Sequence, residues 1–124
     1  MNIGRDFTFE IPECVLVQVQ QRAIMSGRLR SAQMRHLISM GLEFAGDDDT
    51  NVTFPADERL VRTTLRIPYD ILETIKDRGA QFNRSTGREV VSLIIYAIEE
   101  AAKRDLEAIR ELMSREAQRH SRTA

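Results

Sequence analysis

The residues Arg62-Thr63-Thr64-Leu65-Arg66-Ile67-Pro68 alternate between two kinds of side chain. Side chains of a strand point to opposite faces in turn, so Thr63, Leu65 and Ile67 share one face. The other face carries Arg62, Thr64 and Arg66. Pro68 cannot donate a backbone hydrogen bond and has a fixed φ, which ends the strand and suits the first turn of a helix. The pattern predicts a short strand with one packed face and one basic, hydroxylated face.

Two amphipathic helices are predicted after Pro68. Apolar residues recur at three- and four-residue spacing from Ile71 to Ala80, and this helix is expected to end near residues 81–83. The segment Thr86-Gly87-Arg88-Glu89 then has the pattern of a capping box, in which Glu89 reaches back to the first amide of a second helix. The apolar stripe of that helix is Val90, Leu93, Ile94, Ala97, Ile98 and Ala101.

The same arrangement occurs earlier in the chain, where Pro12 lies 56 positions before Pro68. At this displacement, the alternating strand residues correspond to Phe7, Phe9 and Ile11. The helical stripes also correspond without a gap, through Val15, Leu16, Val19, Ala23 and Ile24, then Met34, Leu37, Ile38, Gly41, Leu42 and Ala45. Two copies are too few for a solenoid. The sequence therefore predicts a tandem duplication, with a first unit at 1–45, a linker at 46–61 and a second unit at 62–101.

The two predicted strands should pair with each other. Each unit has only about 40 residues, near the lower limit for independent folding, and a lone strand leaves its backbone groups unpaired. An antiparallel register can place opposite charges face to face: Thr8 with Thr64, Asp6 with Arg66, and Glu10 with Arg62. The linker can extend to roughly 50 Å, which permits pairing within one chain. A homodimer with one Phe-rich acidic ribbon and one basic ribbon is the alternative.

The order of strand, proline, helix, Asn83-Arg84-Ser85 and longer helix resembles the ribbon-helix-helix (Arc/MetJ-type) DNA-binding family. The duplicated layout is similar to that of TraY-like proteins. The resemblance covers roughly residues 5–45 and 62–101. It implies a mainly α fold with a two-stranded antiparallel β-ribbon, to which the apolar pattern after Ala101 adds an extended C-terminal helix. It also implies sequence-specific binding of double-stranded DNA, as in a transcriptional repressor or regulator.

By this resemblance, the outward face of the ribbon reads base edges in the major groove. Arginine can donate two hydrogen bonds to guanine, and threonine can bond base edges or touch a thymine methyl group. Carboxylates near phosphates are repelled unless a nearby arginine offsets them, so the first strand is expected to act mainly through Thr8. The implied base-reading residues are Arg62, Thr64, Arg66 and Thr8, with Asp6 and Glu10 as ribbon contacts.

The starts of the two second helices are expected to hold the DNA backbone. A helix N-terminus presents free amides and the positive end of the helix dipole, which together favour phosphate. Such contacts set the register of the protein on DNA, while the strands specify sequence. The expected phosphate-binding residues are Arg84, Ser85, Thr86, Gly87, Arg88, Arg28, Arg30 and Ser31.

The formal net charge of −1 over 124 residues lacks the basic excess common in DNA-binding proteins. The acidity is concentrated in residues 46–61, which carry one basic and five acidic side chains, whereas residues 62–98 carry six basic and four acidic ones. The linker is interpreted as a solvated connector. Asp47-Asp48-Asp49 lacks the ligand spacing of a calcium loop, so no metal site is expected.

Other features exclude several classes of protein. No apolar run approaches the ~18 residues of a membrane span, no signal-peptide pattern opens the chain, and Cys14 is the single cysteine, so a cytoplasmic protein without membrane contact is expected. Cys14 is interpreted as a small packing residue rather than a reactive thiolate. No Gly-rich phosphate loop, nucleophile–base pair or Cys/His cluster is present, so neither enzyme activity nor a cofactor is expected.

Residues 102–124 continue the helical pattern to about Arg115. Their apolar residues are Ala102, Leu106, Ile109, Leu112 and Met113. This narrow seam either packs back onto its own domain or pairs with another chain, and self-association is expected. Two alternative functions use the same features: a plasmid relaxosome accessory protein of the TraY-like kind, and an antitoxin-like protein that binds a second protein through this C-terminal helix.

Overall fold

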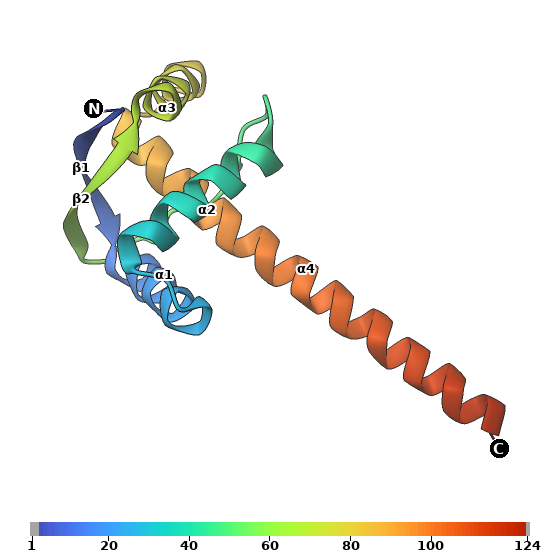
Figure 1. The fold of residues 1–124 in the computed structure, drawn as a ribbon. Helices are drawn as coiled ribbons and strands as arrows, with labels where there is room; N and C mark the ends of the chain where they lie inside the picture. Colours follow the sequence, from blue (N-terminus) through green and yellow to red (C-terminus); the bar gives the residue numbers. More distant parts are fainter. Residues whose placement is uncertain (1–2, 124) are drawn as a thin grey trace.

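The computed structural model describes residues 3–123, and its fold is mainly helical with one two-stranded antiparallel sheet, as predicted (Figure 1). The elements in order are β1 (Gly4–Pro12), α1 (Glu13–Ser26), α2 (Arg30–Ala45), β2 (Leu60–Pro68), α3 (Tyr69–Gln81) and α4 (Thr86–Thr123). Each of β1, α1 and α2 begins 56 positions before β2, α3 and α4, respectively. Helix α4 extends out of the body of the protein as a long rod (Figure 1).

The sheet pairs β1 with β2 of the same chain, in the predicted register. Thr8 lies opposite Thr64, and the two neighbouring pairs are Asp6 with Arg66 and Glu10 with Arg62. The hydroxyl oxygens of Thr8 and Thr64 are 2.8 Å apart and share a hydrogen bond. Both the pairing within the chain and its register are therefore confirmed.

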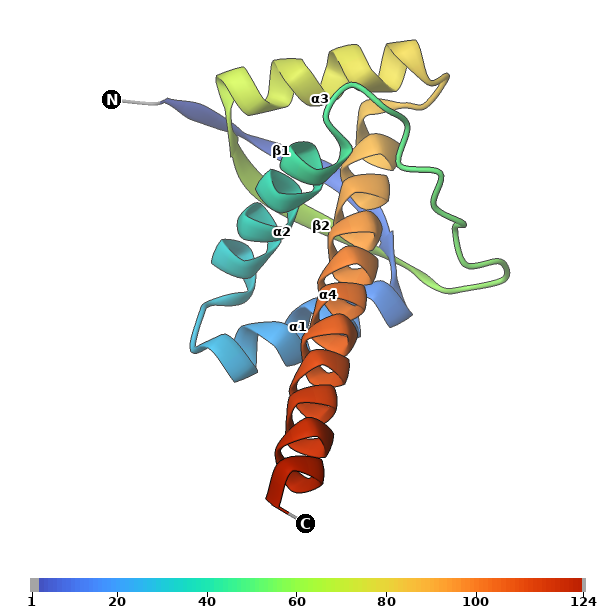
Figure 2. The same ribbon diagram turned by 90° about the vertical axis from the view of Figure 1, so that its right-hand side faces the viewer.

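The core lies between the inner face of the ribbon and the first half of α4. Ile11 and Ile67 point inward from the two strands and are buried, as are the α4 residues Leu93 and Ile94. Helix α2 crosses α4 beside the ribbon (Figure 2). At the crossing, a Cβ atom on Gly41 would lie 2.5 Å from the carbonyl oxygen of Leu93. Glycine at this position therefore allows the two helices to approach closely.

The predicted capping box at the start of α4 is wrong. The residue before the helix, Ser85, is the cap: its Oγ accepts a hydrogen bond from the backbone N–H of Arg88 at 3.2 Å. The Glu89 side chain is fully buried and accepts hydrogen bonds from Arg78 and Arg84 at 2.9 Å each. Two guanidinium groups compensate the buried carboxylate better than one backbone amide would.

The linker is only partly the solvated connector that its acidity predicts. Thr50 is buried, and its hydroxyl lies 2.8 Å from that of Ser92 in α4. Arg78 donates hydrogen bonds to the carbonyl oxygens of Gly46 and Asp48, at 2.7 and 2.8 Å. The start of the linker is therefore fixed against α3 and α4. Strand β2 also begins at Leu60, two residues before the predicted boundary of the second unit.

The end of α4 differs from the prediction. The helix continues to Thr123 instead of about Arg115. Its contacts with the rest of the chain include that of Arg104, whose guanidinium lies 3.9 Å from the centre of the Phe44 ring. Packing of the whole seam onto its own domain is wrong, because its large apolar residues are 48–67% exposed: Leu106, Ile109, Leu112 and Met113.

One residue of the stripe predicted for α1 also departs from the pattern. Ile24 is 76% exposed instead of packed in the core. It lies in the last turn of α1, just before Gly27 takes a left-handed conformation with φ of 68° and ends the helix. The chain turns away there, so no neighbouring element covers Ile24.

Candidate nucleic-acid interface

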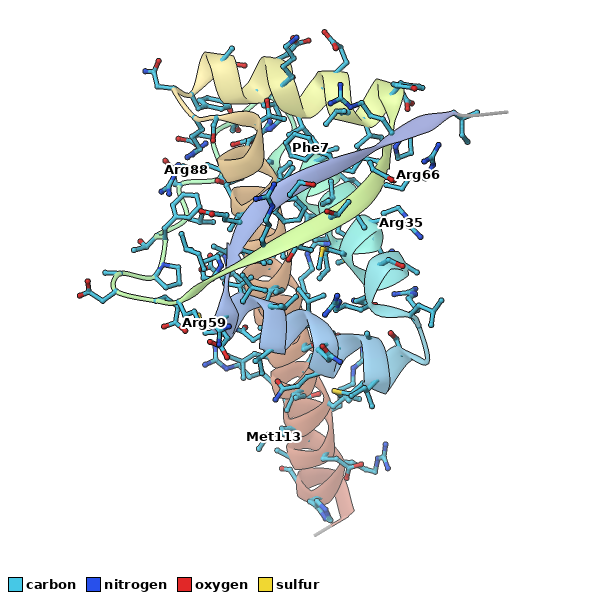
Figure 3. The ribbon with its side chains drawn as sticks, turned by 90° about the vertical axis from the view of Figure 1, so that its left-hand side faces the viewer. Phe7, Arg35, Arg59, Arg66, Arg88 and Met113 are labelled. Carbon is cyan, nitrogen blue, oxygen red and sulfur yellow. The ribbon has the colours of Figure 1, made fainter. Side chains whose placement is uncertain are left out.

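The outward face of the ribbon is polar except at its end, where Leu60 is 53% exposed. Alternation sends most apolar side chains of both strands toward the core and leaves exposed polar side chains on the opposite face (Figure 3). These are Asp6, Thr8 and Glu10 from β1, and Arg62, Thr64 and Arg66 from β2. The structure therefore brings together all the residues that the sequence assigns to base reading.

The two arginines of this face have different surroundings. Arg66 donates a hydrogen bond to the carbonyl oxygen of Gly4 at 2.9 Å and forms a 3.4 Å ion pair with Asp6. Both side chains of the pair are largely exposed, so the pair is weak and its arginine can exchange partners at little cost. Arg62 lies opposite Glu10, but no ion pair joins them within residues 3–123.

The start of α4 lies against β1. A Cβ atom on Gly87 would be 3.2 Å from the Cβ of Phe9, so glycine permits this close approach. Thr86 and Gly87 are half-buried, whereas Ser85 and Arg88 are exposed. The Arg88 guanidinium lies 4.0 Å from the centre of the Phe54 ring, a cation–π contact that orients it.

The start of α2 lies on the other side of the ribbon (Figure 3). Arg30 and Ser31 are exposed in its first turn, and the preceding residue, Leu29, supplies no side-chain cap. The first amides of this helix therefore have no side-chain acceptor from the cap residue. The N–H of Gln33 donates instead to the backbone carbonyl oxygen of Leu29, at 2.9 Å. Arg28 donates a hydrogen bond to the side-chain oxygen of Gln33 at 3.1 Å.

Arg84 does not lie on this surface. Its side chain is 14% exposed and forms ion pairs with Asp49 at 2.6 Å and Glu89 at 2.9 Å. Burial by itself would raise the pKa of Asp49, but the hydrogen bond from Arg84, the backbone hydrogen bonds from Asn51 and Thr50 and the charge of Arg84 together outweigh it and hold that pKa below the ordinary value. Arg84 is therefore committed to the fold, which weighs against its predicted contact with phosphate.

Two further arginines, which the sequence patterns did not predict as contacts, lie beside the ribbon. Arg35 lines a groove of about 330 Å³ between α2 and the end of β2, with Ile67 and Pro68 on its other side. Arg59 is exposed directly before β2 (Figure 3). The sequence could have indicated Arg35, because it follows Ser31 by four positions and so lies on the same face of the helix.

Cys14 is a half-buried packing residue rather than a reactive thiolate. Burial raises the pKa of its thiol, and the neighbouring Glu58 carboxylate raises it further. No group of three or more His, Cys, Asp or Glu side chains within residues 3–123 is arranged to hold a metal ion. None of the helices described there combines the length and apolar character needed to cross a membrane.

Comparison with known proteins identifies no relative: no family model, curated protein or solved structure matches this chain. The function must therefore be inferred from the geometry of the chain itself.

Proposed function

We propose that this chain is a sequence-specific double-stranded DNA-binding protein of the ribbon-helix-helix type, acting as a transcriptional repressor. The observation that carries the proposal is the outward polar face of the ribbon, flanked on opposite sides by the starts of α2 and α4. A two-stranded ribbon fits the major groove, which is roughly 12 Å wide, and helix starts on both sides suit the two phosphate backbones.

The two halves of the chain support a duplicated unit. They have the same order of strand, helix and helix, at a displacement of 56 residues, and their strands pair about Thr8 and Thr64. One chain would then supply both halves of a DNA-binding unit that otherwise needs two copies. Because β1 contributes carboxylates and β2 contributes arginines, the ribbon is asymmetric and should prefer a non-palindromic site.

The exposed residues divide into two proposed roles. Arg62, Thr64, Arg66 and Thr8 read base edges, while Asp6 and Glu10 orient the arginines across the ribbon. Arg30, Ser31, Ser85 and Arg88 contact phosphate, together with Arg28 and the backbone amides of Thr86 and Gly87.

The decisive experiment is selection of binding sites from random duplex DNA with the purified chain at low salt, followed by titration of the selected duplex. Arg62→Ala should weaken binding by about 1–3 kcal/mol and relax base preference at one position. Arg30→Ala should weaken binding to all sequences alike and reduce the salt slope by about one unit. Arg110→Ala is the matched control, because it removes one positive charge from the part of α4 that is distant from the ribbon.

The results distinguish recognition of specific bases from general electrostatic attraction to DNA. Equal effects of Arg62→Ala and Arg110→Ala on the selected site would show that only overall charge matters. Failure of the folded chain to enrich any site would refute the proposal. A relaxosome accessory protein would use the same ribbon, and it differs in bending its DNA site without repressing a promoter.

The exposed end of α4 is the proposed site of self-association with a second copy in antiparallel orientation. Residues 99–111 carry three basic and five acidic side chains, whereas residues 112–123 carry three basic and one acidic. Antiparallel pairing therefore sets the basic end of one helix against the acidic part of the other, around the exposed seam of Leu106, Ile109 and Leu112.

Light scattering tests this pairing on the same sample. The full chain should be a dimer at micromolar concentration, and Ile109→Glu should make it a folded monomer that keeps its DNA preference. A monomeric full chain that co-purifies with a second protein through α4 would instead favour the antitoxin-like function.

A further inference from the structure

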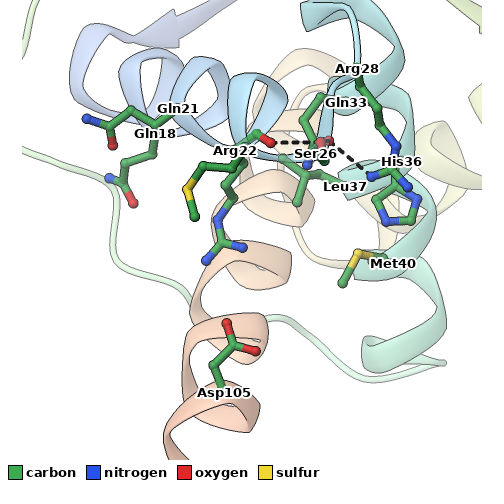
Figure 4. A pocket seen from close by; sticks show the side chains of 11 residues that line it. Gln18, Gln21, Arg22, Ser26, Arg28, Gln33, His36, Leu37, Met40 and Asp105 are labelled. Atoms are coloured by element: carbon green, nitrogen blue, oxygen red, sulfur yellow. Dashed lines mark hydrogen bonds between the residues drawn. The ribbon is translucent and has the colours of Figure 1, made fainter.

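A surface pocket of about 490 Å³ lies between α1, α2 and α4, away from the ribbon (Figure 4). Its polar lining includes Arg22, Arg28, Gln33 and His36, with Leu37 and Met40 on an apolar wall. Asp105 of α4 lies at its edge. Of the residues that line the pocket, the DNA-binding proposal uses only Arg28.

The residues of the pocket have counterparts in the other half of the chain at the displacement of 56. Arg22 corresponds to Arg78 and Arg28 to Arg84, while Gln33 corresponds to Glu89. The inner contacts of the two sites also match: Arg28 donates to the Gln33 oxygen at 3.1 Å, as Arg84 donates to Glu89 at 2.9 Å. The pocket is thus the equivalent, in the first half, of the cluster around Glu89.

That cluster holds an acidic segment, the turn at the start of the linker directly after α2. Arg78 donates to the carbonyl oxygens of Gly46 and Asp48, at 2.7 and 2.8 Å, and Arg84 pairs with the Asp49 carboxylate at 2.6 Å. Thr50 completes the attachment through a hydroxyl contact of 2.8 Å with Ser92, the counterpart of His36. The chain therefore shows how this set of side chains binds an acidic peptide.

In the first half, the corresponding residues 102–106 belong to the continuous helix α4 instead of a turn. Asp105, the counterpart of Asp49, lines the pocket but forms no ion pair with either arginine within residues 3–123. The Arg22 guanidinium has no hydrogen bond or ion pair within residues 3–123, and Arg28 bonds only the neutral amide of Gln33 there. Glutamine in place of Glu89 removes the carboxylate that balances the two arginines in the other half. Of the charged groups that line the pocket, Arg22 and Arg28 are opposed only by Asp105, which is exposed.

We propose that this pocket binds an acidic peptide segment of a partner protein, in a turn like that of the linker start. An aspartate carboxylate of the peptide would pair with Arg28, and two backbone carbonyl oxygens would accept hydrogen bonds from Arg22, as the linker does at Arg84 and Arg78. Charge-assisted hydrogen bonds of this kind are the stronger ones in proteins.

The test uses the full chain and a fluorescein-labelled peptide with the sequence of residues 46–52, in a fluorescence anisotropy titration at low salt. The wild-type chain should bind it. Arg28→Gln and Arg22→Gln should each weaken binding about ten-fold, as expected for loss of a charge-assisted hydrogen bond. A peptide carrying Asp49→Asn should bind the wild-type chain about ten-fold more weakly for the same reason.

Lys76→Gln is the matched control, because it removes one exposed positive charge on α3, which does not line the pocket, and should leave the affinity unchanged. Circular dichroism melts of all variants should confirm that they are folded. The proposal is overturned if the folded wild-type chain gives no anisotropy change at millimolar concentration. It is also overturned if Arg28→Gln and Lys76→Gln act equally, or if the peptide still binds the Arg22→Gln and Arg28→Gln variants by displacing the linker.

Discussion

Glu89→Gln should destabilise the folded chain by about 3 kcal/mol. The Glu89 carboxylate is fully buried and accepts hydrogen bonds from Arg78 Nε and Arg84 at 2.9 Å, and from the Ser92 hydroxyl at 3.3 Å. Glutamine has nearly the same shape, so the substitution changes charge and hydrogen bonding without opening a cavity.

The magnitude follows from the two arginines. A hydrogen bond to a charged group contributes about 1.5–3 kcal/mol, and removal of one partner of a buried ion pair costs about 3–5 kcal/mol. Glutamine keeps one acceptor oxygen but turns an NH₂ group toward one of the guanidinium groups. Asp49 still pairs with Arg84, at 2.6 Å, so the loss should fall at the lower end of that range.

Urea denaturation followed by far-ultraviolet circular dichroism measures the change in unfolding free energy. Glu107→Gln is the matched control, since this glutamate is exposed on α4 and its loss should change stability by no more than about 0.5 kcal/mol. A loss below about 1 kcal/mol for Glu89→Gln, with an unchanged dependence on urea, would show that the buried cluster does not stabilise the fold in the way inferred.

Three further outcomes test other parts of the structure. Gly41→Ala should cost about 1–3 kcal/mol in the same urea assay, because its new methyl group would meet the Leu93 backbone at 2.5 Å; a neutral result would contradict the close α2–α4 crossing. The pKa of Asp49 is held below its ordinary value of 3.8, so its stabilisation is complete above that pH and is lost as pH falls further. Asp49→Asn should therefore lower stability at pH 7 and flatten the acid-unfolding profile below pH 3.8, and an unchanged profile would refute the pairing with Arg84. The pKa of the Cys14 thiol is raised, so iodoacetamide should alkylate it more slowly at pH 8 than a cysteine in a short peptide; equal rates would show that it is neither buried nor close to Glu58.

Local patterns in the sequence were enough to predict the elements and the strand pairing. The alternation around Leu65 and Ile67 and the two prolines act on neighbouring residues. The displacement of 56 residues is found by comparing one half of the chain with the other. The register followed from opposite charges on the two strands, and the structure has Asp6 opposite Arg66 as expected. Such features are visible without knowledge of which helix packs on which.

Local patterns were insufficient for side chains whose partners lie far away in sequence. Glu89 matches a capping box locally, but the tertiary structure places it between Arg78 and Arg84. The position of Arg84 beside a helix start likewise predicts a phosphate contact. In the tertiary structure its guanidinium pairs with Asp49, which lies 35 residues earlier. Two guanidinium groups stabilise a buried carboxylate more than one helix amide does. No local sequence pattern shows which of these partners the carboxylate has.

The sequence by itself determined two strand-helix-helix halves, their ribbon and the polar face that the ribbon presents, because these depend on periodicity and on charges of paired strands. Only the tertiary structure decided how the halves differ. Its packing sets the linker against Arg78 and Arg84 in the second half and leaves the equivalent pocket around Arg22 and Arg28 open in the first. The physical reason is that one connecting segment can satisfy only one of two similar sites.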